Sequence, residues 1–188
     1  MQGAQVAFPS IVAFGENAAI PHHMTGDTRL NKIDVVLIDF GARWKGYNSD
    51  CTRTHFVGKV PKKWKKIYET VKASQQAAID YISKQYQTEH QVTKQTSRSN
   101  KKAIELSDVD KVARNYITTR GYPTIPHSLG HGIGLEVHES PSLSPQSKDI
   151  LQDGMVFSIE PGIYLPGEMG VRIEDLATIQ NGKLLLLT

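Results

Sequence analysis

The sequence is poor in cysteine and in long apolar runs, and each scarcity excludes a class of protein. Its 188 residues include one cysteine, Cys51, so no internal disulfide can form and a disulfide-stapled fold is excluded. Apolar runs reach four or five residues, as at 184–187, whereas a membrane-spanning helix needs about 20. The first ten residues show no basic start followed by an apolar stretch, so no signal peptide is visible. These features predict a cytoplasmic protein that does not enter a membrane.

Charge is nearly balanced overall but unevenly distributed. The net charge is +3, yet residues 59–102 hold 11 Lys+Arg against 3 Asp+Glu, so the remainder is acidic. The basic segment suits either a nucleic-acid patch or the solvated face of a helical region. No zinc-finger or aromatic-rich binding signature accompanies the lysines, so the solvated face is favoured and nucleic acid is not an expected partner. A hydrophobic content of 39% is typical of a globular chain and suits one domain over residues 1–188.

Hydrophobic periodicity predicts two helices and several strands. Apolar residues recur at helical spacing over 64–82, which indicates a helix of about five turns. A second helical stripe covers 109–117, and Ser107 is the expected N-cap. The polar stretch 85–102 predicts a solvated loop. Extended segments are expected at 35–38, 52–57, 155–159, 171–173 and 177–179.

An internal repeat relates two parts of the chain. Residues 8–11 (Phe-Pro-Ser-Ile) resemble residues 122–125 (Tyr-Pro-Thr-Ile). In each copy an apolar strand follows, ends in one acid and turns back toward a second acid. The duplication predicts an α+β fold in which two pseudo-symmetric sheet halves face each other with helices outside. The acids reached in this way are Asp39, Asp50, Glu160 and Glu174.

The four repeated acids predict a metal centre. In each copy the two acids flank a glycine-containing turn, so a hairpin would bring their Cα atoms within about 5.5 Å. Converging carboxylates need compensation, and two divalent cations balance four of them. Such donors suit Mn, Co or Zn. The alternative is four unrelated surface acids, which the apolar runs before Asp39 and Glu160 disfavour.

Histidines support the prediction of a hydrolytic site. Five of the seven lie in two clusters, and His131 stands among three glycines that allow close backbone approach. One imidazole with four carboxylates suits a two-metal hydrolase. The glycine run lacks a phosphate-loop lysine, which disfavours nucleotide binding. The clustered histidines are His22, His23, His127, His131 and His138.

At these residues the chain resembles the pita-bread metallopeptidases, the group of methionine aminopeptidase, aminopeptidase P and prolidase. The resemblance covers about residues 8–177 and implies the pita-bread fold. Its motifs are 17–22 (Asn-Ala-Ala-Ile-Pro-His), 39–41 (Asp-Phe-Gly), 46–54 (Gly-Tyr-Asn-Ser-Asp-Cys-Thr-Arg-Thr), 130–141, 160–162 (Glu-Pro-Gly) and 170–175 (Gly-Val-Arg-Ile-Glu-Asp). The metal ligands that it implies are Asp39, Asp50, His131, Glu160 and Glu174.

The resemblance also implies a role for each site residue. Asp50 and Glu174 would bridge two metal ions, and Glu160 would also accept the proton of the attacking water. Arg172 would orient the carboxylates. The residues that would line the substrate pocket, stabilise the tetrahedral intermediate and contact the scissile peptide are His22, His127 and His138.

Within the family, residues 50–54 and 170–175 resemble the proline-peptide branch. They imply an Xaa-Pro aminopeptidase, with an Xaa-Pro dipeptidase as the alternative, acting on peptides with proline beside the scissile bond. Manganese is the expected metal, with cobalt or zinc as alternatives. A binding module without catalysis and an inactive truncated peptidase stay open as further alternatives, although binding-only relatives usually lose ligands.

One departure from the family affects the sheet that carries Asp39. The family's catalytic domain begins with helices before the segment at residue 8, and proline-peptide members carry a further N-terminal domain. The chain is therefore expected to expose an apolar sheet face around Val35 and Leu37, and to self-associate or to require a separate N-terminal segment.

Overall fold

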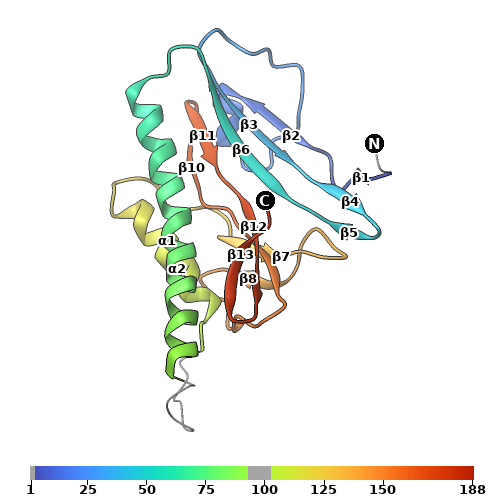
Figure 1. Ribbon diagram of the computed structural model, residues 1–188. Helices are drawn as coiled ribbons and strands as arrows, with labels where there is room; N and C mark the ends of the chain where they lie inside the picture. The colour runs from blue at the N-terminus through green and yellow to red at the C-terminus, as the bar shows by residue number, and fades with distance from the viewer. Residues whose placement is uncertain (1–2, 93–102) are drawn as a thin grey trace.

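The computed structural model describes residues 3–92 and 103–188 and shows an α+β fold. Every strand pair in it is antiparallel, and the two helices lie side by side along one side of the sheets (Figure 1). The first part holds β1 (Gln5–Val6), β2 (Ile11–Phe14), the 3-10 turn η1 (Gly15–Ala19), β3 (Asp34–Phe40), β4 (Ala42–Trp44), β5 (Tyr47–Asn48) and β6 (Cys51–Val57). The helices are α1 (Lys62–Val92) and α2 (Leu106–Thr118). The second part holds β7 (Gly130–Gly132), β8 (Glu139–Leu143), β9 (Val156–Ile159), β10 (Gly162–Leu165), β11 (Met169–Arg172), β12 (Asp175–Gln180) and β13 (Lys183–Leu186).

The strands predicted from the apolar segments are confirmed as β3, β6, β9, β11 and β12. They belong to a three-stranded sheet in the order β2-β3-β6, a five-stranded sheet in the order β13-β12-β9-β7-β8 and the hairpin β10-β11. Main-chain bonds join the two parts, because the Glu174 N–H donates to the Thr52 carbonyl at 3.1 Å. The Thr54 hydroxyl donates to the Arg172 carbonyl at 2.8 Å. β6 therefore lies beside the strand ends of the second part, where two of the predicted acids stand.

Helix α1 follows its predicted stripe but is longer than predicted. Ile67, Val71, Ala78 and Ile82 are fully buried at helical spacing. The loop predicted over 85–102 is wrong for its first eight residues, which continue the helix to Val92. Tyr86, one turn after Ile82, is buried and its hydroxyl donates to the Leu151 carbonyl at 3.1 Å, so tertiary packing extends the helix. Residues 93–102 of the predicted loop lie outside the described residues.

Helix α2 begins one residue earlier than its predicted cap. Its N-cap is Glu105, and Ser107 stands in the first turn, so the prediction of Ser107 as the cap is wrong. The Glu105 side chain makes no capping hydrogen bond, but Glu105 forms a β-bridge with Ile150. The bridge holds the helix entry in place of a side-chain cap.

The apolar face of the first sheet differs from the prediction. Val35 and Leu37 are 0% and 2% exposed, because both point into the core shared with the helices. The prediction that they form an uncovered face is therefore wrong. Side chains alternate along a strand, so Val36, Ile38 and Phe40 share the opposite face of β3, where Phe40 is 47% exposed. No helix in the described part of the chain has the length and apolarity to cross a bilayer.

Candidate metal centre

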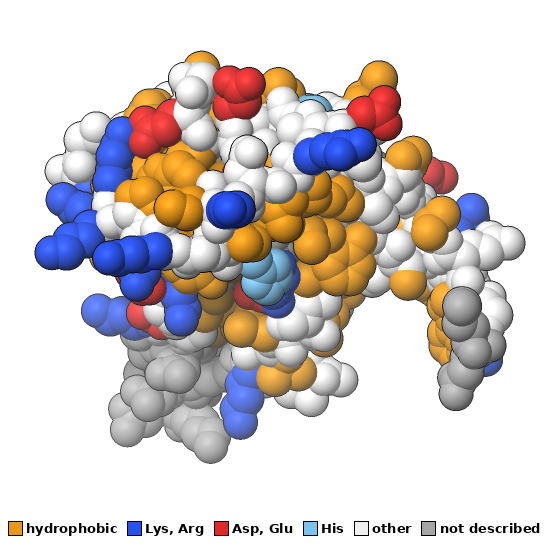
Figure 2. All heavy atoms as spheres, turned by 90° about the horizontal axis from the view of Figure 1, so that it is seen from above, with side chains coloured by type: hydrophobic (Ala, Val, Ile, Leu, Met, Phe, Trp, Pro, Cys, Tyr) orange, Lys and Arg blue, Asp and Glu red, His pale blue; other side chains and the backbone are white. Residues whose placement is uncertain are grey.

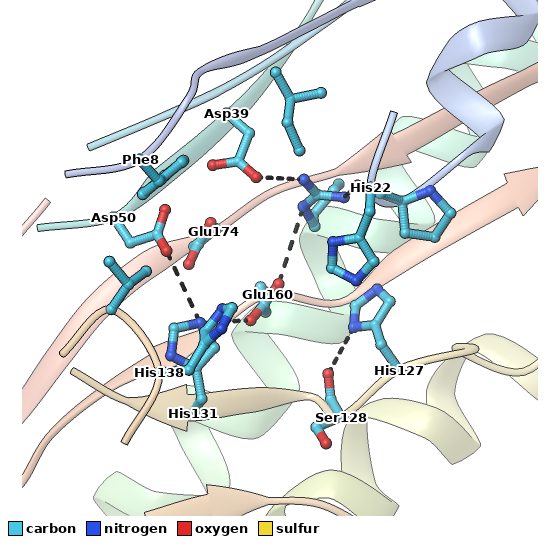
Figure 3. A pocket seen from close by; sticks show the side chains of 14 residues that line it. Phe8, His22, Asp39, Asp50, His127, Ser128, His131, His138, Glu160 and Glu174 are labelled. Carbon is cyan, nitrogen blue, oxygen red and sulfur yellow. Dashed lines mark hydrogen bonds and ion pairs between the residues drawn. The ribbon is translucent and has the colours of Figure 1, made fainter. Parts of the chain in front are cut away.

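A pocket of about 490 Å³ lies between the two parts of the fold (Figure 3). Both sheets and the turn after η1 contribute side chains to it, together with apolar residues such as Phe8, Ile11 and Val137. All nine site residues that the sequence predicts line this one pocket. They are His22, Asp39, Asp50, His127, His131, His138, Glu160, Arg172 and Glu174.

The hairpin prediction is right in register for the second pair of acids. Gly162 pairs with Arg172 in β10-β11, and the same register continued by two residues places Glu160 opposite Glu174. Both glutamates stand just outside the strands, where the chain passes between β9 and β10 and between β11 and β12. The ends of neighbouring strands therefore place both glutamate side chains in the pocket.

The hairpin prediction is wrong in register for the first pair of acids. Asp39 pairs with Thr52 rather than with Asp50, because the turn is centred between Lys45 and Gly46. Both turn residues have positive φ, 50° and 89°, as a tight two-residue turn requires. Asp50 precedes β6 and still reaches the pocket, with 5% of its surface exposed.

Ligand atoms converge in three overlapping groups among the described residues. Asp39, Asp50 and Glu174 each place a carboxylate oxygen within 4.8 Å of the others. His131, Glu160 and Glu174 form a second group under the same limit, and Glu174 is common to both. A third group combines Asp50 and His131 with His138. Figure 3 shows Asp50, Glu174 and Glu160 directed toward the same space, with His131 on its other side.

Buried carboxylate oxygens without partners fit metal ions at this position. In the part of the chain that the structure describes, the buried side-chain atoms that lack a hydrogen bond are one oxygen each of Asp39, Asp50 and Glu174. An unpaired buried oxygen costs about 1–3 kcal/mol, and more when it is charged. Arg172 compensates one of these groups, donating from Nη2 to Asp39 Oδ2 at 2.6 Å. The remaining donors, carboxylates and an imidazole, suit Mn, Co or Zn.

The acids of the centre differ in their protonation. Burial, together with the charges of Asp39 and Glu160, raises the pKa of Asp50 from 3.8 to about 8. Burial and the neighbouring carboxylates also raise the pKa of Glu174 well above its ordinary value. Burial alone would raise the pKa of Glu160, but the hydrogen bond and charge of His131, whose Nε2 lies 3.3 Å from Oε1, lower it. Glu160 therefore stays ionised more readily than Asp50 or Glu174.

The raised pKa values predict that the metal-free protein loses stability as the pH rises. Asp50 and Glu174 hold protons in the folded state at pH values where the unfolded chain has released them. Their protonated forms favour folding only up to the folded pKa, so the free energy of unfolding should fall between about pH 5 and about pH 8. Thermal denaturation with a chelator across this range measures the effect. A stability that increases over the same range would contradict the assignment.

Thr52 was not predicted from its residue type, yet it connects two site residues. Its hydroxyl donates to Glu174 Oε2 at 2.7 Å and accepts from Arg172 Nε at 3.1 Å, and its side chain is fully buried. Ser158 has a comparable position, donating to Glu160 Oε1 at 3.1 Å and accepting from the His131 N–H at 3.0 Å. Ser158 is a single hydroxyl in the otherwise apolar strand β9, which is a sequence signal, whereas Thr52 lies among the mixed residues of β6 and carries none.

Tyr164 is a further residue that sequence reasoning missed. Its hydroxyl lies 2.8 Å from His127 Nε2 and accepts from Arg172 Nη1 at 3.1 Å. Burial raises the pKa of Tyr164 to about 12, so the phenol stays protonated at neutral pH. Since Arg172 can only donate to it, the tyrosine proton is available to His127. Nothing in the local sequence around Tyr164 marks it as a site residue.

Two further histidines, His127 and His138, are held neutral at the pocket wall. Burial lowers the pKa of His127, and burial with the charge of His131 lowers that of His138. The His138 ring stands edge-on to the His131 ring at a centroid distance of 4.2 Å. Arg114 of α2 donates to the His127 carbonyl at 3.0 Å, which anchors the loop that carries His127. His22 is exposed at the pocket mouth.

Comparisons with known proteins show which family this chain resembles in sequence and in fold. The model of metallopeptidase family M24 matches residues 1–181. An Xaa-Pro dipeptidase of Pyrococcus horikoshii is 43% identical over 185 residues, which are 97% of this chain and 48% of that protein. The crystal structure of a prolidase from Thermococcus sibiricus superposes with a TM-score of 0.86 at 43% identity, covering 98% of this chain and 46% of that one. An X-Pro aminopeptidase from Thermotoga maritima gives a TM-score of 0.82 at 35% identity, covering 96% and 47%.

The chain thus spans about half the length of the relatives that it matches. The predicted pita-bread architecture is confirmed, because the superposed prolidase and aminopeptidase cover nearly all of the chain at high TM-scores. The match to the family model covers far more than half of the sequence. Because both its sequence and its fold match those of family members, the chain belongs to metallopeptidase family M24.

Proposed function

We propose that the chain carries the metal-dependent active site of an Xaa-Pro dipeptidase. The observation that carries the proposal is the convergence of four carboxylates and His131 in one pocket, with three buried oxygens left unpartnered. The sequence motifs alone favour an Xaa-Pro aminopeptidase first. The Pyrococcus dipeptidase and the Thermococcus prolidase are more similar to this chain than the Thermotoga aminopeptidase, which supports the dipeptidase alternative instead.

In this proposal two divalent ions, manganese first among the candidates, occupy the centre. Asp39, Asp50 and Glu174 would hold one ion, and His131 and Glu160 would hold the other together with Glu174. Asp50 lies within reach of both groups and would share the bridging role. Such ions would supply Lewis acidity and a nucleophilic water at neutral pH.

The protein's own side chains would perform the proton transfer and stabilise charge. Glu160, ionised beside His131 and oriented by Ser158, would accept the proton of the attacking water. His127 is neutral. Tyr164 donates to its Nε2 at 2.8 Å and its Nδ1 lies 2.7 Å from the Ser128 carbonyl, so it would line the pocket wall with both ring nitrogens engaged. His138 lies beside His131 and would contact the scissile peptide.

Phe8, Ile11 and Val137 give the pocket an apolar wall next to the acids. A proline ring is apolar and compact, so this wall suits a peptide with proline beside the scissile bond. The pocket volume of about 490 Å³ also suits a substrate the size of a dipeptide. The single free cysteine is compatible with a cytoplasmic location, which we retain as part of the proposal.

Metal titration combined with peptide hydrolysis tests the proposal. Calorimetry and elemental analysis after manganese loading should give about two ions per chain, since four carboxylates require about that compensation. The loaded protein should hydrolyse an Xaa-Pro dipeptide faster than an Xaa-Pro-Yaa tripeptide. Faster tripeptide cleavage would support the aminopeptidase instead. Metal binding without hydrolysis would support a binding module, and no binding tighter than millimolar would exclude the metal centre.

We further propose that the partner of this chain is a second copy, bound through the exposed apolar residues around the first sheet. Phe40, Trp44 and Tyr47 are 47%, 51% and 65% exposed on β3, β4 and β5. Figure 2 shows that hydrophobic side chains are also exposed on the face seen from above, between charged and other polar ones. Exposed apolar patches of this kind mark partner surfaces.

Light scattering after size-exclusion chromatography measures the association. The wild-type protein should elute above its monomer mass at micromolar concentration, and Phe40→Ser should weaken association because it removes apolar area from the patch. Leu186→Ser on β13 is the matched control, because Leu186 is similarly exposed at 49% but belongs to the other sheet. A stable and fully active wild-type monomer would overturn the proposal.

A further inference from the structure

Gln75 is a buried amide on α1 that binds the backbone of the metal centre from outside the pocket. Its side chain is 6% exposed, and it does not line the pocket. The amide nitrogen donates to the Ile159 carbonyl and to Asp175 Oδ2, both at 3.0 Å. It also lies 3.4 Å from the Ile173 carbonyl, a longer contact. A glutamine amide has two hydrogens, so the two shorter bonds satisfy it and the third shares a hydrogen.

The acceptors of Gln75 flank two predicted metal ligands. Ile159 directly precedes Glu160, and Asp175 directly follows Glu174. Ile159 and Asp175 are also register partners, the last pair of the β9-β12 ladder. One side chain therefore bonds to both strands at the last register pair of this ladder, and each strand carries its predicted ligand at the adjacent residue. This convergence is not expected of a helix residue that only fills the core.

Main-chain contacts also hold the two glutamates. The pair Ile159–Asp175 lies on one side of them, and on the other side the Ile173 N–H donates to the Pro161 carbonyl at 3.4 Å. The Glu160 N–H donates to the Leu129 carbonyl at 2.8 Å, and the Glu174 N–H donates to the Thr52 carbonyl at 3.1 Å. These bonds tie each glutamate to a different part of the fold. Gln75 adds one side chain that bonds to both strands at once, so it reinforces the main-chain pairing that relates one ligand backbone to the other.

We propose that Gln75 is a positioning residue of the metal centre: its amide holds the backbones of Glu160 and Glu174 at the separation that lets both carboxylates reach one ion. The inference rests on the proposed metal-dependent function. Outer contacts of this kind change metal affinity by about 10–100-fold when they are removed. Gln75 does not line the substrate pocket. Its loss should therefore lower the metal affinity, and the rate of hydrolysis should fall only because less metal is bound.

Three variants on one helix separate positioning from a purely structural role. Gln75→Met keeps the length of the side chain and removes both donors. Ser74→Ala removes a buried hydrogen bond of the same helix, from Ser74 Oγ to the Ala113 carbonyl of α2 at 2.8 Å, with no contact to the ligand strands. Gln76→Met changes the same residue type at an exposed neighbouring position, where the amide donates to Asp80 at 2.8 Å.

Manganese affinity by calorimetry, measured well below each melting temperature, is the deciding readout. Gln75→Met should bind manganese about 10–100-fold more weakly, and excess manganese should restore its kcat toward the wild-type value. Ser74→Ala should lower the melting temperature with unchanged metal affinity, and Gln76→Met should change neither. If Gln75→Met does not fold, Gln75→Asn, which keeps an amide but is too short to reach both strands, should show the same weakening.

The other possible outcomes would reject either the role of Gln75 alone or the proposed function together with it. Wild-type manganese affinity in Gln75→Met or Gln75→Asn, with only a lower melting temperature, would show that Gln75 is structural and would leave the proposed function intact. A wild-type protein that binds no manganese tighter than millimolar would overturn the proposed function and the role of Gln75 together. Equal weakening in Ser74→Ala would show that any buried change in α1 disturbs the centre, which would also reject the specific role.

Discussion

Replacing Glu174 by alanine is expected to abolish peptide hydrolysis and tight metal binding. Glu174 is the one residue that belongs to both carboxylate-rich groups of ligand atoms found in the described chain, and it is 1% exposed. One of its oxygens is held by Thr52 at 2.7 Å, while the other has no partner and faces the site. Removal of a single electrostatic contact costs about 10²–10³ in kcat, so losing a shared ligand should cost at least about 10³.

Asp50→Ala should behave in the same way, because Asp50 also belongs to two of the ligand groups. Glu168→Ala is the control for Glu174. It removes a glutamate from the turn of the neighbouring hairpin, where Glu168 pairs with Lys63 at 2.6 Å on the surface, and both activity and metal affinity should be retained. Metal affinity by calorimetry and kcat/KM on an Xaa-Pro dipeptide are the measurements.

His138→Ala distinguishes a ligand from a substrate-contacting residue. His138 is exposed and lies beside His131, and the proposed role predicts that its variant keeps metal while losing about 10²-fold or more of the rate. The third group of ligand atoms, which includes His138, makes this a real alternative. If His138→Ala lost the metal and Asp50→Ala kept it, the assignment of roles would be reversed.

The convergence of the four candidate acids could be predicted from the sequence because two local signals combine there. Asp39 and Glu160 end apolar strands, and Asp50 and Glu174 each follow after one turn, so spacing alone places the acids near one another. The pocket contains all of them. The register of the first hairpin was harder to predict from the sequence, because it depends on whether the turn is centred before or after Lys45. A shift of one residue at a turn moves the pairing by two residues.

Residues such as Thr52 and Gln75, which hydrogen-bond to the predicted ligands or to their strands, could not be predicted from the sequence, because their hydrogen-bond partners are distant in the chain. Thr52 reaches Glu174 across 122 positions, and Gln75 reaches Ile159 across 84. Tyr164 gains its role only because Arg172 and His127 meet there, one from a neighbouring strand and one from a loop anchored by α2. Such side chains carry no local pattern, and only the tertiary fold gives them acceptors.

Arg172→Met is expected to cause the largest loss of stability among the site variants. Arg172 is 2% exposed and is surrounded by acceptors on several segments: Asp39 at 2.6 Å, Thr52 and Tyr164 at 3.1 Å, and the Pro21 carbonyl at 3.2 Å. Burial alone would lower its pKa, but Tyr164, Asp39 and Glu160 raise it, so the guanidinium stays charged. It is therefore the cation that compensates the acids before metal binds.

Removing one partner of a buried ion pair costs about 3–5 kcal/mol, because the other charge is left uncompensated. Arg172→Met should lower the free energy of unfolding of the metal-free protein by about that amount, and urea denaturation measures it. Arg43→Met on β4 is the control, since Arg43 is exposed and its loss should cost less than about 0.5 kcal/mol.

Metal should then recover part of the stability that Arg172→Met loses, because divalent ions also compensate the carboxylates. Arg172→Lys should be intermediate: it keeps the positive charge but cannot donate to Asp39, Thr52 and Tyr164 in one plane. A loss below about 1 kcal/mol in the metal-free Met variant would mean that protonation of Asp50 and Glu174 already relieves the repulsion. In that case the guanidinium would matter for orienting Asp39 and not for holding the two parts of the fold together.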